Sequence, residues 1–223
     1  MSKKIAKWDH TALCHFMGEY AKKKMNAGLV FVEHKTMMTH QIPDVLIYRQ
    51  TCTIELEIKV NRADFLADQK KPHRMDPSKG VGDYRFYVAP KGMIKVEELP
   101  EHWGLLEVSG KRVYKTHVPP SFQCLYGNRE YLMSAIKQQW KEFYKPERYP
   151  GYRKHIQRSI RRDVADVSFI FPEKDISAET SFLYAAHRQE IIASQKGLIK
   201  PAKDIVWVRP FNGDMMDEGR LLR

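Results

Sequence analysis

The sequence predicts an α/β fold, with a mixed sheet of four to five strands flanked by helices and a mainly helical C-terminal extension. Three observations lead to this expectation. Apolar residues recur at helical spacing near the N-terminus, short strand-like segments follow between residues 29 and 118, and helical periodicity returns beyond Pro119-Pro120. The 223 residues suit one domain with an extension. We therefore expect a core over residues 1–120 and a basic extension over 121–223, and leave open whether the extension packs on the core.

The first half begins with a helix from about Trp8 to Asn26, because four apolar residues between positions 13 and 20 share one helical face. Strand-like segments follow at 29–33, 43–49 and 52–60. The last of these alternates best, with aliphatic residues at every second position. Because only a short turn around Gln50 separates the last two segments, we expect them to pair antiparallel.

The rest of the core is predicted from its turn and cap residues. Asn61 is a typical helix N-cap, and we expect a short helix from there to Lys71, ended by Pro72. The aromatic-rich segment 83–89 is strand-like. A hairpin is expected around Ser109-Gly110.

Helical patterns dominate the second half. Asn128 is expected to cap a helix that runs to about Tyr144, and further helices are expected at about 152–164 and 179–194. In the second of these three helices, Ile156, Ile160 and Val164 are four residues apart and should form its buried stripe. One strand-like piece remains near the C-terminus, at 205–208.

The charge of the chain favours polyanionic partners. Thirty-eight Lys and Arg residues against 27 Asp and Glu residues give a net charge of +11, which favours nucleic acid first. No apolar run approaches the roughly 18 residues of a membrane-spanning helix, so we expect no membrane partner. The three cysteines are expected to be small buried residues of a reducing compartment, and the nine histidines show no zinc-motif spacing. We expect a cytoplasmic protein of a bacterial or phage-infected cell.

A basic helix is the strongest candidate for nucleic-acid contact. The expected helix over 152–164 has one aliphatic stripe, and its remaining faces are cationic and flanked by tyrosines. Cations among aromatic rings suit phosphate pairing and base stacking. A solvated basic face remains the alternative. The candidate nucleic-acid-binding residues on this helix are Arg153, Lys154, Arg158, Arg161 and Arg162.

Carboxylates and an ammonium group gather on one strand. On segment 52–60, Glu55, Glu57 and Lys59 share one face, opposite a fully aliphatic face. Asp44 lies near the far end of the neighbouring strand, and whether it faces Glu57 depends on the register of the pair. Two carboxylates at this place suit a hard divalent cation such as Mg²⁺. The alternative is an ordinary charge pair on a wet face, and Glu55 is expected to be a surface charge.

These residues resemble the signature of the PD-(D/E)XK nuclease superfamily, in which Pro43-Asp44 and Glu57-Ile58-Lys59 match the motif. The run EIKVNRADFLADQK from Glu57 to Lys70 is similar to the MmcB-like DNA repair family, and the likeness extends over about residues 8–118. The resemblance implies a restriction-endonuclease-like fold, Mg²⁺ or Mn²⁺ as cofactor, Asp44 and Glu57 as metal ligands, and Lys59 as the catalytic lysine. It also suggests Glu19, the acid in the middle of the first helix, as a further ligand.

The function expected from this resemblance is that of a metal-dependent deoxyribonuclease, acting in repair, recombination or phage–host conflict. Arg62 and Lys70 would reach a phosphate from the helix that follows the motif. A two-fold dimer would serve the cutting of two strands. Two alternatives stay open: a non-catalytic nucleic-acid- or protein-binding protein that keeps the fold, and a protein that acts on RNA.

Overall fold

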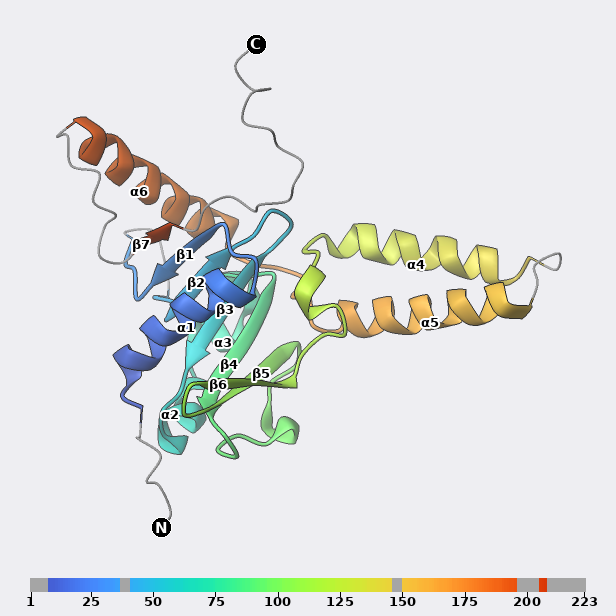
Figure 1. Ribbon diagram of the computed structural model, residues 1–223, viewed down its shortest axis with the longest axis horizontal. Coiled ribbons are helices and arrows are strands. Elements are labelled where there is room, and N and C mark those ends of the chain that lie inside the picture. The colour runs from blue at the N-terminus through green and yellow to red at the C-terminus, as the bar shows by residue number, and fades with distance from the viewer. Residues whose placement is uncertain (1–7, 37–40, 146–149, 196–204, 208–223) are drawn as a thin grey trace.

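One mixed sheet with helices on both faces forms the body of the protein (Figure 1). The computed structural model describes residues 8–36, 41–145, 150–195 and 205–207, with side chains described through residue 189. The strands are β1 (Leu29–Val32), β2 (Val45–Tyr48), β3 (Thr53–Ile58), β4 (Tyr84–Pro90), β5 (Trp103–Ser109), β6 (Arg112–His117) and β7 (Ile205–Trp207). The helices are α1 (His10–Lys24), α2 (Arg62–Asp68), α3 (Pro72–Met75), α4 (Arg129–Phe143), α5 (Pro150–Val167) and α6 (Ile176–Gln195).

The strand order is β6-β5-β4-β3-β2-β1-β7. The central pairs β3–β4 and β4–β5 are parallel, and every other neighbouring pair is antiparallel. Strands β3 and β4 are buried over almost their whole length, as expected for parallel strands that helices cover on both sides. The sheet exceeds the expected four to five strands, because the partly exposed hairpin strand β6 and the short β7 extend its two edges.

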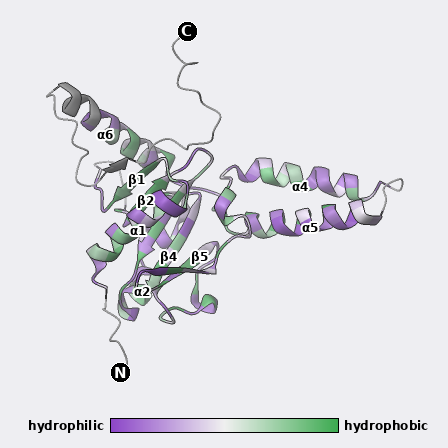
Figure 2. Ribbon diagram, viewed as in Figure 1, coloured by the Kyte–Doolittle hydropathy of each residue, from purple (hydrophilic) through white to green (hydrophobic). Residues whose placement is uncertain are grey.

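Helix α1 covers one face of the sheet and forms the larger core. Leu13, Met17 and Ala21 of α1 are buried against the aliphatic face of β1, β2 and β3. Along α1, hydrophobic and hydrophilic segments alternate (Figure 2). A Cβ atom at Gly18 would lie 2.8 Å from Cγ2 of Val32, so this glycine lets the helix approach β1 closely. The alternating side chains of β3 therefore divide as predicted: Ile54, Leu56 and Ile58 face α1.

The opposite face is covered by elements from both halves of the chain. Helix α6 packs Phe182 against Phe31 of β1, with ring centroids 5.4 Å apart. The chain just before α6 also contributes buried apolar residues, Ile170 on the α1 side and Phe171 beside Trp103. Part of the segment 121–223 therefore packs on the sheet and completes its core.

Helices α4 and α5 form an antiparallel hairpin that extends away from the sheet (Figure 1). Its own small core includes Ile136, Ile156 and Ile160. The predicted stripe on α5 is wrong at its last position, because Val164 is exposed and Val167 takes the buried place. On a helix with 3.6 residues per turn, each step of four residues turns the side chain further round the axis and away from the buried face. Seven residues make almost two full turns, so Val167 lies on the same face as Ile160.

The segment after β3 begins as predicted and ends differently. The Asn61 side chain accepts a hydrogen bond from the Asp64 N–H and caps α2. Helix α2 ends at Asp68, three residues before the expected end, and Pro72 opens the short helix α3. Proline is well suited to the first helical position, where its missing N–H has no partner to lose.

None of the helices in the described part of the chain is long and apolar enough to cross a membrane.

Candidate active site

The sheet register brings Asp44 and Glu57 together. Val45 of β2 pairs with Leu56 of β3, and this is the last pair of the ladder. Asp44 directly precedes β2, so the same register places it level with Glu57. The Asp44 carboxylate also accepts a hydrogen bond from the Ile58 N–H through Oδ2, at 2.7 Å. Its carbonyl accepts from the Glu33 N–H at 2.9 Å. Asp44 is therefore fixed at the end of β2 by the strands on both sides.

Glu57 and Lys59 form a buried ion pair rather than a wet one. Only 5% of Glu57 and 6% of Lys59 is exposed, and Lys59 Nζ lies 2.6 Å from Glu57 Oε1. Glu55, which we expected at the surface, is fully buried on the same face. That face is dry because α2, α3 and α6 cover it, which the strand pattern alone does not reveal.

Arg74 of α3 joins three buried carboxylates. Its Nη2 lies 2.6 Å from Glu57 Oε2, its Nη1 lies 3.0 Å from Glu55 Oε1, and its Nε lies 2.7 Å from Asp68 Oδ2. The guanidinium also stacks over the Trp103 ring, 4.6 Å from its centroid. A planar group with five donors is the side chain best suited to hold several carboxylates at once.

Asp68, from the last turn of α2, is the second centre of this cluster. Its Oδ1 accepts from Lys59 Nζ at 3.1 Å and lies 2.6 Å from Lys71 Nζ. Its Oδ2 accepts from the Tyr87 hydroxyl at 2.9 Å and from Arg74. Asp68 therefore links the lysine of the motif to the arginine of α3.

Three buried acids of the cluster face three buried cations. The acids are Glu55, Glu57 and Asp68. Those cations are Lys59, Arg74 and Arg85. Buried carboxylates persist only where such partners compensate the lost hydration.

The two acids at the centre differ in proton affinity. Burial is the main cause that raises the pKa of Glu57 from 4.5 to about 7, and the charge of Asp44 adds to it against the opposing effect of Arg74. Burial also acts to raise the pKa of Asp68, but Arg74, Lys71 and Lys59 outweigh it and hold that pKa well below its ordinary value. Burial acts to lower the pKa of Lys59, and Glu57 outweighs it, so the pKa of Lys59 is raised. Lys59 is therefore an ammonium ion at neutral pH.

Glu19 does not take the place suggested for it on α1. It lies on the exposed side of the helix and forms ion pairs with Lys22 and Lys23. The α1 residues whose ligand atoms lie beside Asp44 are His10 and Cys14. Glu19 is nine residues from His10, which is two and a half turns and therefore the opposite side of the helix.

The two cations suggested near the motif lie at the surface. Arg62 donates to both carboxylate oxygens of Glu98 and to the carbonyl of Met93, so its guanidinium already has partners. Lys70 is exposed. Lys71, its neighbour, points to the cluster instead and lies 3.7 Å from Glu57 Oε1.

The basic candidates of the second half lie on α5 of the projecting hairpin. Lys154, Arg158, Arg161 and Arg162 are exposed, whereas Arg153 is half-buried. On α4, the exposed rings of Trp140 and Tyr144 stack with centroids 5.9 Å apart.

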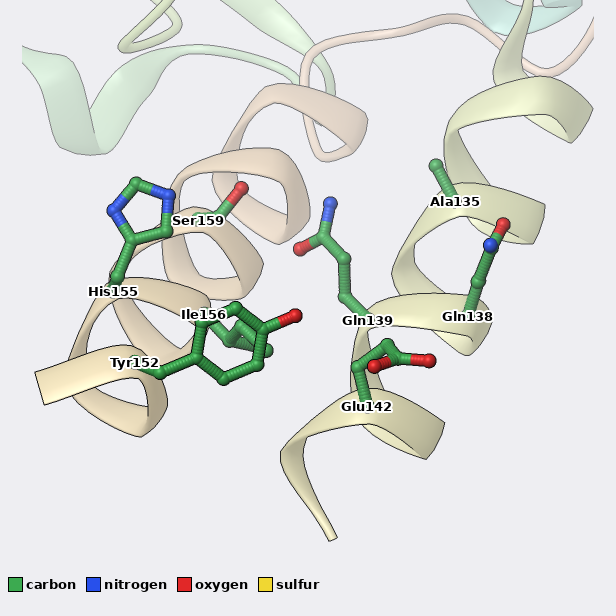
Figure 3. Close-up of a pocket in the computed structure, with 8 residues that line it drawn as sticks. All are labelled: Ala135, Gln138, Gln139, Glu142, Tyr152, His155, Ile156 and Ser159. Carbon is green, nitrogen blue, oxygen red and sulfur yellow. The ribbon is translucent and has the colours of Figure 1, made fainter. Parts of the chain in front are cut away.

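A cavity of about 360 Å³ opens between the two helices of the hairpin (Figure 3). Its polar lining comes from Gln138, Gln139 and Glu142 of α4 and from Tyr152, His155 and Ser159 of α5. Ala135 and Ile156 add apolar surface, so the cavity has a mixed lining, while the exposed side of α5 is cationic.

Sequence reasoning missed several members of the cluster. Asp68 and Arg74 lie beyond the motif and are brought back by two short helices that local patterns do not position. The spacing of Asp68 could have indicated its burial. It lies three residues after the buried Phe65, so the two side chains share one face of α2. The spacing of His10 and Cys14 could likewise have indicated a shared site, since residues four apart lie on the same face of a helix.

This chain matches no protein-family model, and no curated protein and no solved structure is similar enough to count as a match.

Proposed function

We propose that this protein is a metal-dependent deoxyribonuclease that hydrolyses phosphodiester bonds at the cluster around Asp44, Glu57 and Lys59. One observation carries the proposal: Asp44 directly precedes β2, one residue beyond the Val45–Leu56 pair and so level with Glu57 of β3, and Lys59 Nζ lies 2.6 Å from Glu57 Oε1. Paired carboxylates beside a buried ammonium group are suited to phosphoryl chemistry, since the first bind a cation and the second stabilises negative charge.

The donor set fits a hard divalent cation such as Mg²⁺ or Mn²⁺. Asp44 and Glu57 would hold it, because carboxylate oxygens are the ligands that such ions prefer. A bound cation polarises the phosphodiester and lowers the pKa of a bound water. Glu57 Oε2 is in contact with Arg74, so we expect cation binding to exchange part of that ion pair.

Lys59 would act through its charge. Because its pKa is raised, it is protonated at neutral pH and is a hydrogen-bond donor rather than a base. Its ammonium group would stabilise the negative charge that develops on the phosphoryl oxygens. Asp68 would position it, since Asp68 Oδ1 accepts a hydrogen bond from Nζ at 3.1 Å.

The hairpin of α4 and α5 would bind the DNA backbone. Its exposed cations on α5 and the stacked rings of Trp140 and Tyr144 provide the two contacts that nucleic acids use without base reading.

A second candidate function is favoured by one specific contact. Arg74 fills the space beside Glu57 and neutralises the cluster with no metal ion. In a protein that keeps the fold as a binding module without catalysis, such an internal cation would stabilise the fold, because the buried carboxylates then have permanent partners.

A cleavage assay separates the two candidates. Supercoiled, linear, branched and single-stranded DNA, and a single-stranded RNA, are incubated with Mg²⁺, Mn²⁺ or a chelator. The proteins are the wild type, Glu57→Gln, Lys59→Met and the exposed control Glu97→Gln. We expect metal-dependent cutting of DNA that both site variants lose and the control keeps. Absence of cutting on every substrate, with DNA binding intact in all four proteins, would favour the binding module.

A further inference from the structure

Three residues of different donor chemistry meet beside Asp44. His10 and Cys14 are one turn apart on α1, and together with Asp44 they place one ring nitrogen, one sulfur and one carboxylate oxygen within 4.8 Å of one another. Two potential ligands at a spacing of four on a helix present their donor atoms on one side, as in helical zinc-binding motifs.

The distances are close to those between the ligands of one metal ion. His10 Nε2 lies 3.3 Å from Asp44 Oδ1 and 4.0 Å from Cys14 Sγ, and His10 Nδ1 lies 3.6 Å from the same sulfur. Bonds of about 2.0–2.3 Å at tetrahedral angles put neighbouring donor atoms roughly 3.3–3.6 Å apart. The three side chains therefore need only small rotations to share one ion.

The groups around the three donors hold them in place. The second nitrogen of His10, Nδ1, lies 3.4 Å from Glu33 Oε1, which is the carboxylate–histidine arrangement that orients metal-binding imidazoles. The second oxygen of Asp44 is held by the Ile58 N–H at 2.7 Å. Each of these two ligands is thus fixed through its other polar atom.

The three donor residues differ in their exposure to solvent. The His10 side chain is 40% exposed, the Asp44 side chain is 15% exposed and Cys14 is fully buried. Three protein ligands with one open side are typical of metal sites that keep a position for water or substrate.

We propose that His10 Nε2, Cys14 Sγ and Asp44 Oδ1 bind one divalent transition-metal ion of the zinc class. A thiolate and an imidazole favour such an ion over Mg²⁺ or Ca²⁺, which take oxygen ligands. Binding forms the metal–sulfur bond and releases the thiol proton of Cys14 to solvent. This site goes beyond the proposed nuclease function and does not depend on it, although the two share Asp44.

Cobalt titration tests the site, because a thiolate bound to Co²⁺ gives a charge-transfer band in the near ultraviolet and tetrahedral Co²⁺ gives intense visible bands. Untagged full-length protein is titrated with CoCl₂, followed by ZnCl₂ or MgCl₂. The variants are Cys14→Ser, His10→Ala and, as a control for the exposed cysteine, Cys124→Ser. His10 is half-exposed, so its variant keeps the test valid if Cys14→Ser fails to fold.

We expect one Co²⁺ per chain with both sets of bands, displaced by equimolar Zn²⁺ and kept in millimolar Mg²⁺. Both site variants should lose the sulfur band, and Cys124→Ser should keep it. Absence of the band in the wild type, or its persistence in His10→Ala, would overturn the proposal. Glu57→Gln separates this site from the nuclease, since it should keep the cobalt spectrum while it abolishes cleavage.

Discussion

Nη2 of Arg74 lies 2.6 Å from Oε2 of Glu57, so a buried guanidinium from α3 contacts the central carboxylate of the motif on β3. The same guanidinium reaches Glu55 and Asp68. Because the three acids come from two elements, Arg74 connects α2 and α3 to the centre of the sheet. The stability of the fold and the state of the candidate site are therefore coupled through one side chain.

Replacement of Arg74 should destabilise the protein strongly. Arg74→Met leaves three buried carboxylates without their shared cation, and the loss of one partner from a buried ion pair costs about 3–5 kcal/mol. Arg62→Met is the matched control, because Arg62 pairs with Glu98 but is 45% exposed, against 2% for Arg74. An exposed ion pair contributes little to stability, because water screens it. Urea unfolding measures both, and equal losses in the two variants would contradict the assigned role of Arg74.

The raised pKa of Glu57 predicts a dependence of stability on pH. Below pH 4.5 its carboxyl group is protonated in both the folded and the unfolded chain. Between pH 4.5 and 7 the unfolded chain has released this proton while the folded chain keeps it, so stability falls as pH rises through this window. Above pH 7 the carboxyl group is ionised in both states, and the loss of stability is at its full value.

Glu57→Gln isolates this contribution, because glutamine cannot titrate. Unfolding free energies of both proteins are compared at pH 5, 6, 7 and 8. The wild type should lose on the order of 1–3 kcal/mol relative to the variant between pH 5 and 8. A difference between the two proteins that stays constant over this range would show that Glu57 titrates at its ordinary value.

The sequence predicted those parts of the fold that depend on local pattern. Asn61 and Asn128 cap helices as expected, and β2 pairs with β3 through the short turn at Gln50. The position of Asp44 level with Glu57 could not be predicted, because it depends on a register that a turn of uncertain length leaves open.

The burial of the site also depended on distant segments. The strand pattern alone predicts a wet face for Glu55, because no local feature indicates that α3 and Phe171 cover that side of the sheet. Glu19 is an acid in the middle of α1, but the side that a helix turns to the sheet is set by packing. Buried Leu13, Met17 and Ala21 fix that direction and turn Glu19 toward solvent.

We expect helix α6 to unfold together with the sheet. Phe182 is fully buried between α6 and β1, and the truncation of a buried phenylalanine costs about 3–5 kcal/mol. Tyr184, two residues on, is exposed on the same helix, and Tyr184→Ala should change stability by only about 0.5 kcal/mol. The free energy of unfolding of Phe182→Ala distinguishes a core helix from a separate extension, which would leave stability unchanged.

The last prediction concerns the cations of α5. Lys154, Arg158 and Arg161 are exposed on the hairpin, and each phosphate contact contributes about 0.9 to the slope of log K against log salt concentration for duplex DNA. Replacement of all three by Gln should weaken duplex binding and reduce that slope by about 2–3. A variant with Lys22, Lys23 and Lys24 of α1 changed to Gln loses the same charge and should keep most of the slope. Fluorescence anisotropy over a salt series measures the affinity and the slope for each variant. Similar decreases in the two variants would show that binding depends on net charge rather than on the hairpin.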